Sequence, residues 1–181
     1  MCFIGLSLLS LALLQAPVPK EIERILPIKS EKSMGFGTPI SLTQVLTAFH
    51  VVDPEAEYSF GESEILLVIR KSKERDLALV KTSDPHQPVD VADSLPKIQA
   101  EVFYRCYLAG AIPTVIRSRY LGLDADGDLI LDGTAYPGCS GSGILDTNGR
   151  LVGVLTMVWT PGPGVTALVV GKDIRKFWKV E

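Results

Sequence analysis

The sequence predicts an all-β protein in two halves, each a sandwich or a barrel, and three observations lead to this prediction. Short apolar runs recur along its 181 residues. Glycine, proline, Asn-Gly and Asp-Gly signals separate these runs. A polar stretch that contains three prolines, residues 84–96, divides the runs into two groups. Short strands with this spacing are typical of β-sandwiches and β-barrels.

The expected strands lie on either side of the linker at 84–96. Those of the first half are residues 35–52, 64–70 and 76–82. Those of the second half are residues 102–110, 114–122, 128–132, 143–147, 150–159 and 164–170. We therefore expect an N-terminal β-domain over residues 21–90 and a C-terminal β-domain over residues 97–171.

Two segments between the later strands predict hairpin turns. The sequence D-A-D-G-D at 124–128 also resembles the start of a calcium loop, but Ala135 stands where such a loop needs a glutamate. A hairpin turn at residues 126–127 is therefore favoured. The Asn-Gly pair at 148–149, between two apolar runs, predicts a two-residue hairpin turn.

The C-terminal segment, residues 172–181, is amphipathic. Ile174, Phe177 and Trp178 follow helical spacing, and lysines and an arginine surround them. We expect one short helix that closes the second β-domain. A helix lying on a membrane surface is the alternative.

The N-terminal segment, residues 1–16, is almost entirely apolar or small. It is too short for a comfortable membrane span but suits a signal-peptide core. No basic residue precedes the apolar run, and cleavage after Ala16 would leave Pro17 at the cut. An uncleaved anchor and a buried strand are therefore the alternatives. We expect the protein to be secreted or anchored outside the cytoplasm, with membrane contact only through residues 2–16.

Composition and charge exclude several functions. The chain is 46% hydrophobic and 22% charged, with a net charge of −3, as expected for a globular protein. No basic cluster precedes the C-terminus, so we expect no nucleic-acid binding. Cleavage of the leader would remove Cys2 and leave Cys106 and Cys139. These are too few for a disulfide framework and wrongly placed for zinc, so we expect them unpaired, with no metal and no cofactor.

Residues 138–142, G-C-S-G-S, follow the pattern G-x-S-x-G except at its last position, where Ser142 stands; this pattern surrounds the nucleophile of several unrelated hydrolases. An α/β-hydrolase needs its histidine after the serine, but the chain's two histidines, His50 and His86, both precede Ser140. The subtilisin order needs an acid before the histidine, on a helical framework. What remains is the order His, Asp, Ser on β-structure.

His50 and Asp76 are the candidates that complete this set. Taken alone, His50 at the end of an apolar strand is a structural histidine, and Asp76 before another strand is a turn residue. Together with Ser140 among glycines they occur in the required order, in separate halves of the chain. The combination favours a catalytic triad.

The segments that hold these residues resemble a known family. V-L-T-A-F-H-V-V, D-L-A-L-V and P-G-C-S-G-S-G-I-L are similar to the histidine, aspartate and serine segments of chymotrypsin-like serine peptidases. The resemblance covers residues 34–180 and is strongest to the compact bacterial branch, the high-temperature-requirement peptidases, here without a PDZ-like domain. It implies two six-stranded antiparallel β-barrels with a short C-terminal helix, and a monomer that acts on polypeptide substrates.

The resemblance also assigns roles. Ser140 would attack the peptide bond, His50 would move the proton, and Asp76 would orient the imidazole. The N–H groups of Gly138 and Ser140 would form the oxyanion hole. The hydroxyl of Thr156 would hydrogen-bond Asp76.

A substrate pocket follows from the same resemblance. Thr134 would form its base, Thr156, Met157 and Val158 one wall, and Gly164 would leave the opposite wall open. A neutral base cannot compensate a buried Lys or Arg, so the resemblance implies cleavage after small to medium aliphatic residues.

Three positions depart from the family pattern. Phe49 replaces a small residue, Ser142 replaces a glycine, and Cys139 replaces the aspartate that receives a new N-terminus in trypsin-like enzymes. Two alternatives to a general endopeptidase stay open. One is a self-processing peptidase of the viral type, and the other is an inactive relative that serves as a binding module.

Overall fold

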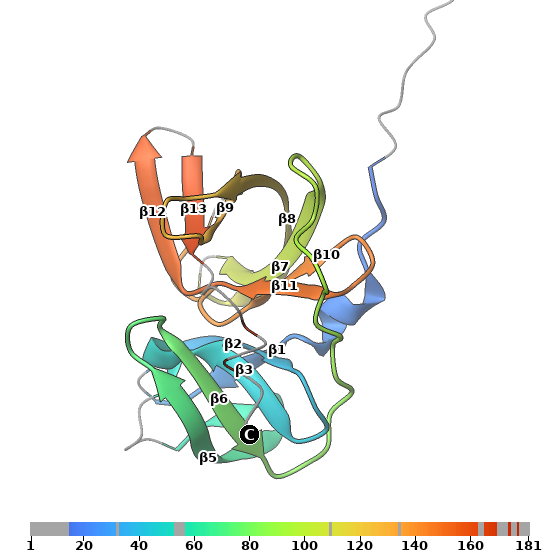
Figure 1. The fold of residues 1–181 in the computed structure, drawn as a ribbon. Coiled ribbons are helices and arrows are strands. Elements are labelled where there is room, and N and C mark those ends of the chain that lie inside the picture. The colour runs from blue at the N-terminus through green and yellow to red at the C-terminus, as the bar shows by residue number, and fades with distance from the viewer. Residues whose placement is uncertain are drawn as a thin grey trace, which may run out of the picture.

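The computed structural model describes residues 15–31, 33–52, 57–108, 110–133, 135–162 and 165–169, with Ile174 and Phe177. Strands from two consecutive halves of the chain form two separate β-units, which confirms the predicted all-β, double-barrel class (Figure 1). Within these residues, no helix combines the length and apolar character needed to cross a bilayer. The expected export or anchor segment falls almost wholly outside the described residues.

The first unit is a closed six-stranded barrel with the strand order β1-β2-β3-β6-β5-β4. Its strands are β1 Leu26–Lys29, β2 Met34–Pro39, β3 Gln44–Ala48, β4 Ser59–Phe60, β5 Ser63–Ser72 and β6 Leu77–Thr82. The expected strand at 35–52 is instead a β2–β3 hairpin followed by a 3-10 turn, η2 (Phe49–Val51). Buried Ile28, Val45, Phe60 and Val80 fill the barrel.

The second unit is a seven-stranded sheet with the order β11-β10-β7-β8-β9-β13-β12, which curls on itself (Figure 1). Its strands are β7 Glu101–Leu108, β8 Ile112–Leu123, β9 Leu129–Leu131, β10 Gly143–Asp146, β11 Leu151–Val154, β12 Met157–Gly162 and β13 Val165–Val169. It has one strand more than expected because the predicted strand 150–159 is split. Leu155 donates its N–H to Ser142 O and accepts the N–H of Gly141, so it bonds to a loop and not to a strand.

The predicted hairpin turns join β8 to β9 and β10 to β11, and each is one residue longer than two. The Asp146 N–H donates to Arg150 O at 2.9 Å, so residues 147–149 form a three-residue loop, and Gly149 has φ +75°. At 124–128 the Asp124 carboxylate accepts two backbone N–H groups of its own turn, which uses it as a turn residue.

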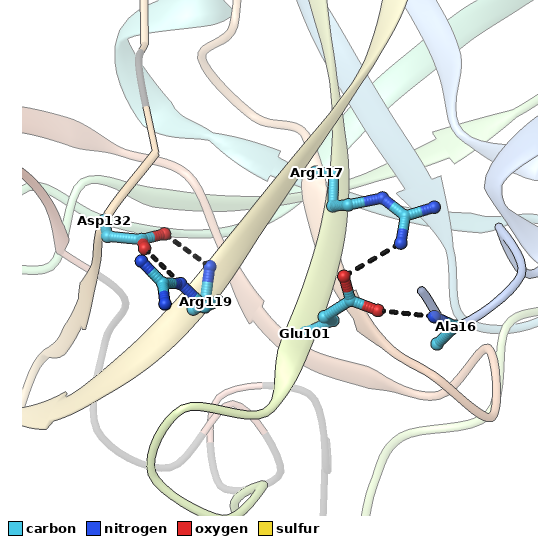
Figure 2. Close-up of polar contacts among 5 residues, drawn as sticks. All are labelled: Ala16, Glu101, Arg117, Arg119 and Asp132. Carbon is cyan, nitrogen blue, oxygen red and sulfur yellow. Dashed lines mark hydrogen bonds and ion pairs between the residues drawn. The ribbon is translucent and has the colours of Figure 1, made fainter. Parts of the chain in front are cut away.

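The segment before the first barrel lies against the second unit. The Ala16 N–H donates to the Glu101 carboxylate at 2.8 Å, and Glu101 pairs with Arg117 at 2.8 Å (Figure 2). A 3-10 turn, η1 (Lys20–Arg24), then buries Ile22 in the core. The N-terminal segment thus ties the two units together.

The linker and the C-terminus make two further connections between the units. Val91 in the linker forms an isolated parallel bridge with Leu151, so the linker covers the outer edge of β11. Ile174 is buried, and the Phe177 carbonyl accepts a hydrogen bond from Arg70 of β5. The remainder of the expected C-terminal helix lies outside the described residues.

Candidate active site

His50 and Asp76 lie at one end of the same strand pair. Strands β3 and β6 are antiparallel, and Ala48 opposite Leu77 is their last pair. The chain leaves β3 through η2, which contains His50, and enters β6 directly after Asp76. Antiparallel pairing therefore brings together two residues that are 26 positions apart in the sequence.

Asp76 holds the histidine segment through three hydrogen bonds. Its Oδ2 lies 2.5 Å from His50 Nδ1, and its Oδ1 accepts the His50 N–H at 2.9 Å. Its backbone carbonyl accepts the Phe49 N–H at 2.9 Å. The side chain of His50 is 49% exposed and that of Asp76 26%, so the imidazole is oriented while one face stays open to solvent.

The backbone of Asp76 has an uncommon conformation. Its φ is +48°, in the left-handed region that non-glycine residues seldom adopt. Asp76 closes a turn in which its N–H donates to Lys73 O at 3.3 Å. The three bonds to residues 49 and 50 fix this conformation, which in turn aims the carboxylate at the imidazole.

Ser140 lies in a tight loop between β9 and β10. The Cys139 N–H donates to Tyr136 O, and the Ser142 N–H donates to Cys139 O, both at 3.1 Å. Gly138 has φ +95° and Gly141 has φ +79°, values that glycine adopts without strain. The glycines around Ser140 thus serve a compact, hydrogen-bonded loop.

The same loop packs closely against the first barrel. Ser140 O accepts the Phe36 N–H at 2.8 Å, and a methyl group on Gly35 would lie 2.6 Å from Ser140 O and 2.8 Å from Val51. A methyl group on Gly141 would overlap Phe36 O and lie 3.1 Å from Ala48 N. Ser140 is therefore close to the residues that flank Phe49 and His50.

Two features of the loop bear on its chemistry. Among the described residues, the N–H groups of Gly138 and Ser140 donate to no protein acceptor. No hydrogen bond joins the Ser140 hydroxyl to the His50 imidazole in the described part of the chain. The His50–Asp76 contact is thus formed, whereas Ser140 is brought near it without a direct bond.

The prediction that Cys106 and Cys139 are unpaired is wrong. The two cysteines form a disulfide that joins the middle of β7 to the residue before Ser140. Sequence reasoning also missed Ser142 as a contact, although its Oγ accepts the Arg105 N–H at 2.8 Å. The available signal was the even number of cysteines that remains after loss of Cys2 in a chain expected to be exported.

The expected pocket is only partly described. Thr134 and Gly164 lie outside the described residues, and Met157 and Val158 are described only as backbone of β12. Thr156 is buried between β11 and β12. Its bond to Asp76 and the other pocket roles remain predictions.

Asp132, two residues before Thr134, has its charge compensated. Its carboxylate accepts the Arg119 N–H and pairs with Arg119 Nε (Figure 2). It also accepts a hydrogen bond from the Ser118 hydroxyl at 3.2 Å. Burial alone would raise the pKa of Asp132, but these hydrogen bonds outweigh it and lower the pKa.

Phe49 and His86 both contact the first barrel. Phe49 packs against its core, and Lys71 Nζ lies 5.7 Å from the ring centre of Phe49. His86 lies in the linker, where its ring makes a T-shaped contact with Phe60, and burial lowers its pKa.

Comparison with known families gives one match. The sequence model of the trypsin-like peptidase domain matches residues 35–154, which contain His50, Asp76 and Ser140. Among curated proteins, none matches the sequence.

Several solved structures share the fold. Rv3671c from M. tuberculosis, solved as an inactive serine-to-alanine mutant, is 20% identical with a TM-score of 0.74, over 92% of this chain and 90% of that one. The serine endoprotease from Yersinia pestis is 20% identical with a TM-score of 0.70, over 86% of this chain and 64% of that one. Deg5 is 18% identical with a TM-score of 0.63, over 81% and 84%.

Proposed function

Because the chain belongs to the family of trypsin-like peptidase domains, we propose that it is a serine endopeptidase that cleaves peptide bonds through an acyl-enzyme on Ser140. The observation that carries this proposal is the pair of hydrogen bonds by which the Asp76 carboxylate fixes both the backbone and the ring of His50. These bonds lie at the end of the first barrel against which the Ser140 loop packs.

The hydrogen bonds of His50 support its role as the base. An ionised carboxylate only accepts hydrogen bonds, so the ring nitrogen Nδ1 beside Asp76 carries the proton. Nε2 is then left with a free lone pair. It accepts the proton of Ser140 during attack and returns it to the leaving amine. In enzymes without substrate the serine–histidine bond is often long, and it tightens when substrate binds.

The backbone of the serine loop supports an oxyanion hole. The N–H groups of Gly138 and Ser140 are unused by protein acceptors among the described residues. They flank Cys139, so both donors belong to one rigid turn. An oxyanion that forms on the substrate carbonyl would take both, and each such donor typically contributes about 10²-fold to 10³-fold in turnover.

The second sheet offers an edge for an extended substrate. The linker covers its β11 edge, whereas β12 pairs only with β13 among the described residues. Strand β12 follows Thr156 directly and begins near the Ser140 loop through Leu155. A peptide that adds as a strand to β12 gains backbone hydrogen bonds, which suits an endopeptidase acting on unfolded chains.

The substrate preference is for small to medium aliphatic residues before the cut bond. The family resemblance assigns Thr134 as a neutral pocket base, and Arg119 and Ser118 compensate Asp132, the nearest preceding acid. The resemblance also assigns Val158 to the pocket mouth, so Val158→Gly should shift the preference towards Phe. One methylene is worth about 1–3 kcal/mol in such a pocket, so the preference is graded. A peptide-library profile dominated by Arg, Lys or Glu would contradict the pocket assignment.

The Cys106–Cys139 disulfide supports a location outside the cytoplasm, secreted or anchored. Disulfides persist in oxidising compartments and are rare in the cytoplasm of mesophiles. Fractionation of cells that make the protein, followed by thiol labelling, tests this. Recovery of the reduced protein from the cytoplasm would contradict it.

Labelling with a fluorophosphonate probe tests the proposed activity. The probe should modify the wild-type protein at Ser140 and should fail with Ser140→Ala and His50→Ala. Ser94→Ala, a linker serine, is the matched control and should label like wild type. A folded wild-type protein that stays unlabelled would favour the inactive binding module. Labelling of Ser140→Ala would instead show that Ser140 is not the nucleophile that reacts with the probe.

A further inference from the structure

The peptide backbone around Cys139 carries both proposed oxyanion donors. Gly138 precedes it and Ser140 follows it, so a small rotation of Cys139 re-aims both N–H groups at once. A backbone N–H group has no side-chain torsion that could turn it independently of the chain. Its direction can be fixed only by fixing the chain on either side.

Three consecutive residues of β7 hold this loop from behind. The Arg105 N–H donates to Ser142 Oγ at 2.8 Å, and Cys106 forms the disulfide with Cys139. A methyl group on Gly138 would lie 3.3 Å from Tyr107 Cβ, so Gly138 rests on that side chain. We call residues 105–107 the β7 support. It reaches the loop on both sides of Ser140.

The β7 support is available because β7 ends its pairing with β10 early. The pairs Phe103–Leu145 and Val102–Asp146 are the only ones between these strands among the described residues. Beyond Phe103 the Arg105 N–H has no strand partner on that side, and the Ser142 hydroxyl supplies the acceptor. A glycine at position 142 has no side chain with which to do so.

The disulfide is buried, which argues against an exchangeable thiol pair. Cys106 is 1% exposed and Cys139 0%. A reductant cannot reach either sulfur without opening the loop. The Cys139 sulfur also accepts the Tyr136 N–H at 3.0 Å, which adds a further fixed contact within the loop.

We propose that the β7 support positions the two N–H groups of the oxyanion hole. The Cys106–Cys139 disulfide is its main connection to the serine loop, and the hydrogen bond to Ser142 is the second. Cys139 and Ser142 are two of the positions at which this chain departs from the pattern of its family, and both departures attach to adjacent residues of one strand. The inference rests on the proposed peptidase function. Cys106, Cys139 and Ser142 are positioning residues, because they act on the substrate only through the backbone of Gly138 and Ser140.

The test compares kcat, KM and melting temperature for three variants at a temperature well below melting. Cys106→Ala with Cys139→Ala removes the disulfide and leaves neither of its two cysteines as a free thiol. Ser142→Ala removes the second contact and keeps the disulfide. Val80→Ala, in the core of the first barrel, is the matched control, since it destabilises the fold without touching the loop.

The double cysteine variant should lose about 100-fold in kcat with little change in KM, because a donor displaced by about 1 Å acts mainly on the transition state. Ser142→Ala should lose about fivefold to tenfold in kcat. Fluorophosphonate labelling should slow in parallel. Val80→Ala should keep wild-type kcat although its melting temperature falls.

A folded double variant with wild-type kcat would overturn the inference while the proposed function stands. If the double variant does not fold, wild-type kcat in Ser142→Ala would overturn it. An inert wild-type protein that the probe does not label would refute the proposed function and this inference with it.

Discussion

His50 and Asp76, at one end of the first barrel, and the serine loop of the second unit are fixed by different kinds of interaction. The His50 ring is half exposed and is fixed by hydrogen bonds to Asp76, from one turn at the end of one strand pair. The Ser140 loop is fixed by a disulfide to β7 and by close backbone contact with β2. The histidine region is open and is fixed by local bonds, whereas the serine loop has buried Cys139, Gly141 and Ser142 and is fixed by contacts with both units.

The difference follows from what each region must do. A proton carrier needs its ring oriented and benefits from access to water and substrate. Oxyanion donors are backbone groups, so aiming them requires that the chain itself be immobile. Substitutions that remove only a side-chain function, at His50, Asp76 or the Ser140 hydroxyl, should therefore abolish catalysis and spare the fold, whereas substitutions that strain the backbone of the serine loop should also destabilise the fold.

The largest expected effect is a loss of kcat in the triad variants, and it tests whether catalysis can be removed while the fold is spared. His50→Ala, Asp76→Asn and Ser140→Ala should each lower kcat by about 10⁴-fold or more, because triad members act as one unit. Their melting temperatures should stay close to that of wild type. Peptide hydrolysis and thermal melting measure both quantities. His86→Ala is the control and should keep full activity; the reverse result, with His86→Ala inert and His50→Ala active, would disprove the assignment.

The next largest effect is a loss of stability, and it tests whether the serine loop is immobilised by close packing. Gly141→Ala should destabilise the protein by about 3 kcal/mol or more, because φ is +79° and the added methyl would overlap Phe36 O. Gly110→Ala has a similar φ of +72° with open space around it, so it should cost only about 1 kcal/mol. Denaturant unfolding measures both. Equal losses would mean that the loop is not tightly packed against the first barrel.

A smaller effect concerns the N-terminal segment. Proteins that begin at Pro17, Lys20 or Glu21 should agree within about threefold in kcat/KM, because each keeps buried Ile22. All three lose the Ala16 contact with Glu101, and those that begin at Lys20 or Glu21 also lose the Pro19 carbonyl that accepts the Ile22 N–H. With Cys139 in place of an acid, no new N-terminus has to be bound for the loop to form. A large difference among equally folded proteins would show that the disulfide does not replace such a switch.

The smallest effect concerns His86, the histidine outside the site. Burial lowers its pKa more than Asp84 raises it. The unfolded chain therefore binds the proton first, and stability is lost as the pH falls below about 6.5. His86→Gln should show a shallower fall in melting temperature between about pH 7 and pH 5. Parallel curves for the two proteins would contradict this.

The sequence was sufficient to predict β-structure beside each residue of the candidate triad, because the neighbouring strands β3, β6 and β10 are mostly apolar. It was insufficient for β1, which contains Pro27, and for β4, which has only two residues. Neither is long enough to show an alternating pattern. Both become strands because closing the barrel gives their backbone groups partners on neighbouring strands.

The connections of the serine loop were harder to predict than its presence. The loop itself was visible in its glycines, but its partners depend on which strand lies behind it. Cys106 and Cys139 are 33 residues apart, and only the order of strands in the second sheet brings them together. The split of 150–159 at Leu155 has the same origin, since its partner is the loop.

Among the described residues, β12 pairs with β13 on one side and with no strand on the other, and this open side affects how the protein behaves in solution. Unpaired strand edges associate with one another as well as with peptides, and folded proteins normally shield them. In concentrated solution the edges of two molecules would compete with any peptide for the same hydrogen bonds. A tight peptide inhibitor would then also act as a solubilising agent, and ligand-free protein would be the form from which aggregation starts.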